Sequence, residues 1–327
     1  MSTGLNLGIV TPVYNDWQSL EHLIRDLDTV AAAMPSASIT VIAVDDGSTL
    51  LPPAEYAFHH LAGVEILNLV CNVGHQGAIC IGLSEAVQHF HFTHIVVMDA
   101  DGEDDPAYVK DMWEMQQQNP DSIIVASRTK RSEGILFRTF YVLYRLIFRM
   151  FTGHNIDFGN FSMLPVEAAR RILHMSETYR HYAASLKKSR LKLAGLSTIR
   201  KKRYAGKSTM NFVSLVKHGF MAISVFADVV QTRLFLVFCA FSSVAIVTGI
   251  MASVMRLFFT GWATPGWATT VAGISFLIVV QSLTLLTVII FGDLNKASLF
   301  HFIPALHARH YVEKRRRIQP KTAVTVS

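Results

Sequence analysis

Short apolar runs alternate with longer stretches of mixed polarity along the first half of the chain. The apolar runs are rich in β-branched residues and are bounded by polar or turn-forming residues, as buried strands are. They cover Leu5–Val10, Ile39–Val44, Val64–Val70, Ile95–Met98 and Ile123–Ala126. Stretches of helix-like composition lie between them at Trp17–Ala33, Gly77–Phe90 and Ala107–Asn119. This alternation predicts an α/β fold with a mainly parallel sheet covered by helices.

Two long apolar runs follow in the last third of the chain. Leu234–Met255 contains no charged residue, and neither does Trp267–Gly292. As a helix the first run extends about 33 Å, which is enough to cross a hydrocarbon core of about 30 Å. The connector contains turn-forming glycine and proline. We therefore expect a transmembrane hairpin; two buried core helices are the alternative, but such helices seldom run this long without a charge.

The charges around these runs predict their orientation. The connector offers only Arg256, whereas basic residues flank the hairpin on both outer sides. The positive-inside rule then places both termini and the catalytic part in the cytoplasm, at the cytoplasmic (inner) membrane. The chain start also lacks the pattern of a secretory signal. The expected organisation is a cytosolic domain over 1–210, an interfacial helix over 211–232, a hairpin over 233–293 with helices at about 234–255 and 267–292, and a basic tail over 294–327.

A second interfacial helix is expected near residues 134–151. This stretch is apolar apart from Arg138, Arg145 and Arg149, which fall within about 40° of one another on a helix. An apolar cylinder with one basic stripe suits the headgroup region of a membrane. A core helix with a solvated stripe is the alternative.

The overall composition is the average of these two parts. Hydrophobic residues make up 51% of the chain, and the formal net charge is +6. Much of the excess positive charge lies near the apolar runs, including the cluster Lys314–Arg317, which we expect to meet anionic lipid headgroups. Binding to nucleic acid is disfavoured because no recognition motif accompanies the cluster. The three cysteines have no paired spacing, which indicates free thiols in a reducing compartment.

Acidic clusters follow two of the predicted strands. Asp45–Ser48 comes after the second strand, and residues 99–105 place five carboxylates after the fourth. Ligands of such sheets bind at the carboxyl ends of the strands. Five neighbouring carboxylates repel one another unless a cation is present, and their oxygens suit Mg²⁺ or Mn²⁺, which bridge the phosphates of a nucleotide. A solvated acidic loop is the alternative.

An ordered set of motifs follows the first four strands: Thr11–Asn15, Asp45–Ser48, Asn72–Gln76 and Asp99–Asp101. This set resembles the family-2 inverting glycosyltransferases, which have a Rossmann-like nucleotide-diphospho-sugar-binding fold. The Asn-X-Gly-His-Gln stretch and the hairpin resemble the polyprenyl-phosphate glycosyltransferases, bacterial two-span relatives of dolichol-phosphate mannose synthase. The resemblance extends from about Gly8 to Gly292.

The resemblance implies a role for each matching position. Donor binding falls to Pro12, Tyr14, Asp46 and Asp99. A divalent metal, Mg²⁺ or Mn²⁺, would be held by Asp99, Asp101 and Glu103. Catalytic positions near the diphosphate or the acceptor phosphate are Asp101, Arg128, Arg131 and Asn160. Acceptor contacts fall to His75, Arg138, Arg203 and Ser208.

The sequence also departs from the family pattern. Glu103 stands where the family often has Gln, and Thr209 stands where the family has a late lysine. Relatives carry Gly-Asp-Phe-Arg where this chain reads Gly159–Ser162, so Asn160 occupies the position of a candidate general base and cannot accept a proton. A lipid phosphate is mostly ionised at pH 7 because its second pKa is about 6, so alignment and leaving-group stabilisation matter more than a base.

The expected reaction is transfer of a hexose or similar sugar from a UDP-sugar, with a GDP-sugar as the alternative, to undecaprenyl phosphate or a related lipid. It would proceed by a single displacement with inversion. A processive polysaccharide synthase is disfavoured because only two spans exist and no Gln-X-X-Arg-Trp motif occurs. A degenerate membrane adaptor that binds nucleotide-sugar without turnover stays open. Contacts between hairpins are compatible with a homo-oligomer.

Overall fold

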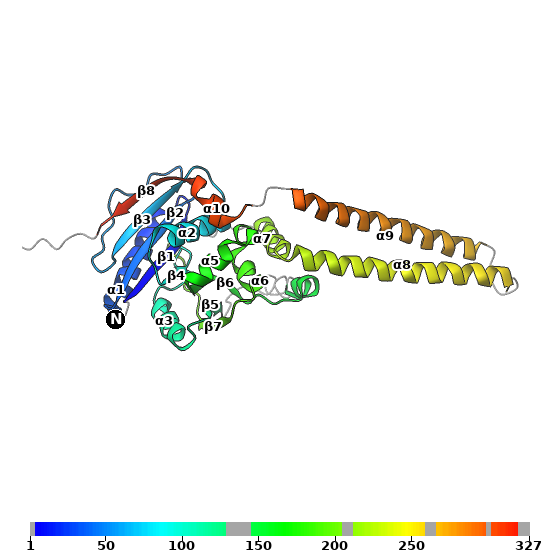
Figure 1. Ribbon diagram of the computed structural model, residues 1–327, viewed down its shortest axis with the longest axis horizontal. Coiled ribbons are helices and arrows are strands. Elements are labelled where there is room, and N and C mark those ends of the chain that lie inside the picture. Colours follow the sequence, from blue (N-terminus) through cyan, green and yellow to red (C-terminus); the bar gives the residue numbers. More distant parts are fainter. Residues whose placement is uncertain (1–3, 129–144, 205–211, 259–265, 299–301, 320–327) are drawn as a thin grey trace, which may run out of the picture. The chain divides into compact units, whose positions relative to one another are not determined.

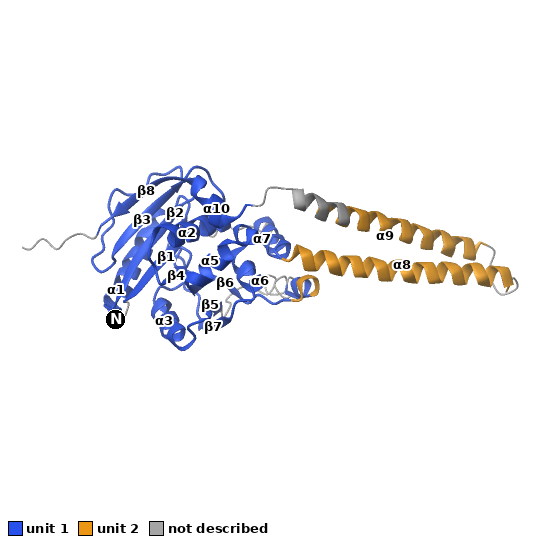
Figure 2. Ribbon diagram, viewed as in Figure 1, with its two compact units in different colours: residues 1–149, 154–225, 302–327 blue, residues 150–153, 226–301 orange. Residues whose placement is uncertain are grey.

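The computed structural model describes residues 4–128, 145–204, 212–258, 266–298 and 302–319. The chain divides into two compact units, shown in Figure 2. A globular unit comprises residues 1–149, 154–225 and 302–327, and a helical unit comprises 150–153 and 226–301. The residues after the hairpin thus belong to the same unit as those before it.

One mixed sheet forms the centre of the globular unit (Figure 1), with its strands in the order β7-β5-β6-β4-β1-β2-β3-β8. The strands are β1 (Leu5–Val13), β2 (Ala37–Asp45), β3 (Gly63–Leu69), β4 (His94–Val97), β5 (Ile123–Arg128), β6 (Phe158–Pro165), β7 (Leu193–Thr198) and β8 (Val312–Ile318). The pairs β1–β2, β1–β4, β2–β3 and β5–β7 are parallel. Strand β6 runs antiparallel to β4 and β5, and β8 runs antiparallel to β3. The predicted fold class, a mainly parallel α/β sheet, is confirmed.

Helices cover both faces of this sheet. They include α1 (Trp17–Ala33), α2 (His75–His89), α3 (Tyr108–Gln118), α5 (Val166–Leu173) and α6 (Tyr182–Lys188). The globular unit also contains α7 (Phe212–Ser224), α10 (Pro304–His307) and the 3₁₀ turns η1 (Ser176–Tyr179) and η2 (Ala308–Tyr311). Helix α1 begins where the Asp16 side chain accepts a hydrogen bond from the Ser19 amide at 3.2 Å, an N-cap.

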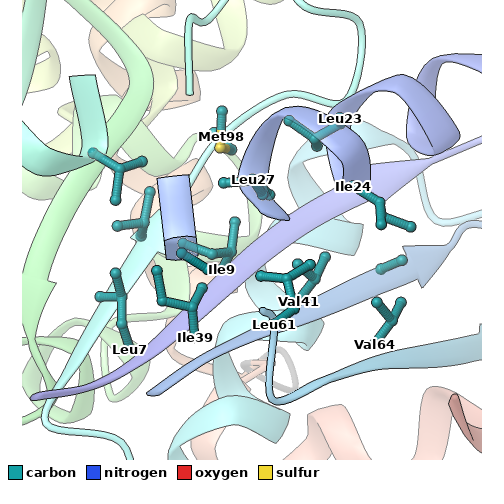
Figure 3. Close-up of a cluster of buried hydrophobic side chains, with 14 of the residues drawn as sticks. Leu7, Ile9, Leu23, Ile24, Leu27, Ile39, Val41, Leu61, Val64 and Met98 are labelled. Carbon is teal, nitrogen blue, oxygen red and sulfur yellow. The ribbon is translucent and has the colours of Figure 1, made fainter. Parts of the chain in front are cut away.

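The core consists of two hydrophobic clusters, one on each face of the sheet. Successive strand residues point to opposite faces, so Ile9 and Val41 enter one cluster while Val10 and Ile42 enter the other. Helices α1 and α3 cover the first cluster, part of which is drawn in Figure 3, and α2, α5 and α6 cover the second. Burial on both faces explains why the strands read as near-continuous apolar runs.

The basic stretch Lys314–Arg317, within the expected basic tail, lies in β8 at the edge of the sheet. Arg315 Nη2 lies 2.5 Å from Glu85 Oε2, and Arg317 Nε lies 3.4 Å from Glu65 Oε1. Glu85 is only 1% exposed. A buried carboxylate without a partner is costly, so these two arginines are engaged in holding the fold together instead of extending toward headgroups.

The helical unit consists mainly of α8 (Ala227–Phe258) and α9 (Trp267–Ser298). Both are long and apolar enough to cross a membrane, and only 6% and 11% of their most apolar windows are buried. The two helices pack closely at Gly249, because a Cβ atom added there would lie only 3.3 Å from Ser275 Cβ. The hydroxyls of Thr248 and Ser275 are 3.3 Å apart at the same contact. The exposed apolar surface of this pair suits lipid, and small residues at the contact are typical of membrane helices.

Candidate functional site

The predicted motifs meet at the carboxyl edge of the parallel strands. Asp45 pairs with Val13 at the ends of β2 and β1, and the Asp46 amide donates to the Val13 carbonyl at 2.9 Å. On the other side of β1, the Met98 amide donates to the Val10 carbonyl at 3.1 Å, which places Asp99 at the same edge. Three motif loops therefore surround one end of β1, as expected for this sheet.

Both carboxylates of the turn after β2 accept hydrogen bonds from backbone amides. Asp45 Oδ1 accepts from the Ser48 amide at 2.9 Å, and Asp46 Oδ1 accepts from the Val73 amide at 2.7 Å. Gly47 has a φ of +70°, and a Cβ there would lie 2.8 Å from the Asn72 amide nitrogen, so only glycine fits. Burial raises the pKa of Asp46 although backbone hydrogen bonds oppose the shift. Asp46 thus ties the second motif to the third.

The first motif presents an aromatic ring beside this turn. Tyr14 is 53% exposed, whereas Pro12 is buried within β1. Asn15 fastens the loop: its Oδ1 accepts from the Leu50 amide at 3.0 Å, and its own amide donates to Ser48 Oγ at 2.9 Å. Among the predicted donor-binding residues Pro12, Tyr14 and Asp46, Tyr14 is the one with an exposed side chain.

A histidine, a carboxylate and two amides form a connected group at the centre of the edge. His75 Nε2 lies 3.1 Å from Asp99 Oδ1 and 3.1 Å from Asn160 Nδ2. Gln76 Nε2 donates to Asn160 Oδ1 at 3.3 Å. Burial is the largest single influence and lowers the pKa of His75, but the charge and hydrogen bond of Asp99 and the charges of Asp101 and Asp46 together outweigh it, so the pKa is raised. Strand β6, inserted between β4 and β5, brings Asn160 to this group.

Ser162, two residues after Asn160, is a packed hydroxyl. Ser162 is fully buried, donates to the Asn160 carbonyl at 2.9 Å and lies 2.8 Å from the Tyr182 hydroxyl. The Tyr182 amide in turn donates to Gln76 Oε1 at 2.6 Å. An arginine at position 162 would have to displace Tyr182. The hydrogen bond from Ser162 to the Asn160 carbonyl instead helps to position Asn160.

The acidic loop, residues 99–105, is paired with arginines from the segment after β7. Arg203 Nη2 lies 2.9 Å from Asp101 Oδ2, and Arg203 Nε lies 3.2 Å from Glu103 Oε1. Arg200 pairs with the other oxygen of Glu103. Burial and the charge of Asp99 raise the pKa of Asp101 against the opposing charge of Arg203.

These carboxylates fit a divalent metal in chemistry, because hard oxygen donors are what Mg²⁺ and Mn²⁺ prefer, and the loop already holds two guanidinium groups. Within the described part of the chain, however, no three His, Cys, Asp or Glu side chains come together as a ready metal site. The oxygens of Glu103 are engaged with arginines, and Asp101 Oδ1 accepts from the Glu103 amide at 2.9 Å.

The model of the family "Glycosyl transferase family 2" matches residues 8–173, about half of the chain, including all four motif loops. The chain belongs to glycosyl transferase family 2. The predicted family is therefore confirmed.

Several proteins are similar to this family 2 chain. The uncharacterized glycosyltransferase YkoT of Bacillus subtilis is 25% identical over 281 residues, covering 83% of this chain and 82% of that protein. The undecaprenyl-phosphate 4-deoxy-4-formamido-L-arabinose transferase of Erwinia tasmaniensis is 30% identical over 134 residues, 39% of each protein. The dodecaprenyl-phosphate galacturonate synthase of Rhizobium johnstonii is 30% identical over 139 residues, 41% of this chain and 39% of that protein.

Among solved structures, a glucosyl-3-phosphoglycerate synthase from Mycobacterium tuberculosis, crystallised with Mn²⁺, UDP-glucose and phosphoglyceric acid, covers 70% of this chain and 80% of its own length. Its TM-score is 0.46 and its sequence identity is 14%.

Some predicted residues of this glycosyltransferase lie outside the described residues: Arg131, Arg138, Ser208 and the side chain of Arg128. The backbone of Arg128 ends β5 opposite Thr198. Arg203, which was predicted to contact the acceptor, pairs with Asp101, and its acceptor contact stays a prediction.

Sequence reasoning missed Arg200 and Tyr182. The basic run Arg200–Arg203 was a usable signal, since four successive cations repel one another unless an anionic partner lies near them. Tyr182 lies within ordinary helical sequence and gave no signal.

Proposed function

We propose that this glycosyltransferase moves a sugar from a UDP-sugar to a polyprenyl phosphate such as undecaprenyl phosphate, with inversion, at the cytoplasmic face of a membrane. The acceptor class rests on one observation above all: Asn160 is held by His75 and Gln76 at the place of a general base. An amide cannot take a proton, and because the pKa of His75 is raised, a larger fraction of its imidazole is already protonated at a given pH and cannot act as a base. A hydroxyl acceptor needs a base, whereas a phosphate is already ionised.

The similarity to two prenyl-phosphate transferases supports the same acceptor. Both matches span about 40% of this chain. The acceptor oxygen would attack the anomeric carbon as the bond to the nucleotide diphosphate breaks, and no proton has to move. Tyr14 would cover the nucleotide base of the donor. His75, held by Asp99, would orient the acceptor phosphate.

A divalent cation, when bound by Asp99, Asp101 and Glu103, would supply positive charge to the departing diphosphate. The partly buried hydrogen bonds from Ser162 and Gln76 would keep Asn160 in place during this step. Positioning of this kind contributes to rate because reacting groups meet in the right geometry.

The topology of the hairpin supports a location at the membrane. Helix α7 precedes the helical unit and residues 302–318 follow it, and both belong to the globular unit. A compact unit lies on one side of a membrane, so the chain must cross an even number of times. Two helices of suitable length meet that requirement, and the positive-inside rule favours the cytoplasmic side for the globular unit.

Purified full-length protein in detergent, incubated with labelled UDP-sugars, undecaprenyl phosphate and Mg²⁺, should give lipid-extractable label. The matched reaction with undecaprenol, which has the same lipid and a hydroxyl, should give none. Label on undecaprenol would contradict the acceptor argument. Tight binding of donor without any product would instead identify a nucleotide-sugar-binding adaptor.

Orientation can be tested with a thiol reagent that does not cross membranes. Phe258→Cys places a thiol at the exposed end of α8, and the exposed native Cys71 in the globular unit serves as the internal control. In intact cells we expect labelling at position 258 only, and labelling of Cys71 after lysis. The reverse order would overturn the proposed orientation.

A further inference from the structure

The segment from Ile199 to Tyr204, called here the arginine strap, crosses the acidic loop and is fixed to it by its backbone. The Lys201 amide donates to the Glu103 carbonyl at 3.1 Å, and the Tyr204 amide donates to the Asp101 carbonyl at 2.9 Å. The Ile199 amide donates to the hydroxyl of Tyr108 in α3 at 3.2 Å. The strap therefore keeps its place whatever its charged side chains do.

Tyr204 anchors the far end of the strap. Its hydroxyl donates to Asp26 Oδ2 at 2.6 Å, and its ring stacks on His22 with centroids 5.4 Å apart. Gly102 has a φ of +83°, and a Cβ there would lie 2.5 Å from the Tyr204 ring. The acidic loop is thus shaped to lie directly under this ring.

With the strap fixed, its cations satisfy the carboxylates that a metal would need. Arg203 bridges Asp101 and Glu103, and Arg200 takes the remaining oxygen of Glu103. These side chains are only partly exposed, so their attraction is less screened than at an open surface. A divalent cation entering alone would have to break these pairs and would leave two guanidinium groups beside its own double charge.

A nucleotide diphosphate removes this obstacle. Guanidinium groups bind phosphate oxygens in a two-pronged geometry as well as they bind carboxylates. The diphosphate can therefore accept the arginines at the moment that the carboxylates accept the metal. Every charge stays paired in the exchange.

We propose that Arg200 and Arg203 hold Asp101 and Glu103 in the donor-free enzyme and transfer to the donor's diphosphate when a divalent cation binds. This inference rests on the proposed nucleotide-sugar donor, and it assigns both arginines to the donor side of the site. Its consequence is that metal and nucleotide bind cooperatively, each raising the affinity of the other by the same factor.

The test is Mn²⁺ binding to the full chain in detergent, measured by electron paramagnetic resonance of free Mn²⁺, with and without UDP. For the wild type we expect weak binding of Mn²⁺ alone and an increase in affinity with UDP within the usual range for coupled sites, about 5- to 150-fold. In R200Q/R203Q we expect Mn²⁺ alone to bind several-fold more tightly and the effect of UDP to shrink toward unity.

Lys201→Gln is the matched control, since Lys201 pairs with Asp105 at 2.9 Å on the same strap but outside the predicted metal ligands. It should leave Mn²⁺ binding and the UDP effect close to the wild type. R203Q alone, which keeps Arg200, should lie between the wild type and the double variant and serves if the double variant does not fold.

Unchanged Mn²⁺ affinity in folded R203Q or R200Q/R203Q would overturn the exchange, even if the wild type transfers sugar. Failure of the wild type to bind any UDP would overturn the proposed donor, and with it the exchange. The two failures are distinguishable because Mn²⁺ binding without nucleotide is measured separately.

Discussion

Two acidic turns follow β2 and β4 at the same edge of the sheet, and they use their carboxylates in different ways. Asp46 is 3% exposed and accepts a hydrogen bond from a backbone amide that cannot leave. Asp101 and Glu103 are partly exposed and pair with arginine side chains that can swing away. Two similar acidic sequences therefore differ in role: the first turn stabilises the loop structure, and the second turn holds carboxylates whose arginine partners can be replaced by other cations.

The sharpest way to break this contrast is Asp101→Asn. If the second turn carries the chemistry, turnover should fall by about 100-fold or more, as when one group that stabilises transition-state charge is removed, while thermal stability changes little. Sugar transfer to lipid and a melting curve measure the two effects. The control is Asp105→Asn, which removes the outer partner of Lys201 and should keep most of the activity; equal losses in both variants would contradict a special role for Asp101.

Arg315→Gln tests an arginine whose carboxylate partner, Glu85, is buried and therefore serves the stability of the fold. Glu85 is 1% exposed and Arg315 is 43% exposed. Losing one partner of a fully buried pair costs about 3–5 kcal/mol, and we expect a loss of about 2–3 kcal/mol here because water can reach the arginine side. Denaturant unfolding measures it. Arg309→Gln, in η2 outside the β8 strand, is the control; a loss equally large there would argue against the pair.

Asp46→Ala tests the scaffold turn itself. Removal of the side chain leaves the Val73 amide without its acceptor, so the free energy of unfolding should drop by about 1–3 kcal/mol. Asp46→Asn keeps an oxygen acceptor and should cost less. Both are read from chemical denaturation. If Asp101→Asn lowered the free energy of unfolding more than Asp46→Ala does, the roles of the two turns would be reversed: Asp101 would stabilise the fold and Asp46 would not.

The smallest expected effect is a pH dependence at Asp46. Because burial raises its pKa above the usual 3.8 in the folded state, the folded protein binds this proton more tightly than the unfolded chain does. Acidification through that raised pKa should therefore stabilise the wild type relative to Asp46→Asn, and the difference should be lost as pH rises toward neutrality. Melting temperatures of both proteins over this pH range measure it; parallel curves would show that Asp46 does not titrate there.

Much of the fold and part of the site could be predicted from the sequence. Strands β1 to β5 and helices α1 to α3 lie close to the predicted ranges, and α8 and α9 contain the two predicted apolar runs. Strands β6, β7 and β8 were not predicted. Strand β6 carries the Asn160 motif, but its place between β4 and β5 depends on antiparallel pairing with strands far away in sequence.

The sequence by itself determined what neighbouring residues can encode: a strand from a short β-branched run, a helix from its period, a membrane-length helix from an uncharged stretch, and the family from motifs in a fixed order. Only the tertiary structure decided which charges meet. Arg203 and Glu103 are 100 residues apart in the chain, and Arg315 and Glu85 are 230 apart. Pairings over such distances depend on how the whole sheet is assembled, because no local pattern carries the energy of a contact that forms only after the strands have come together.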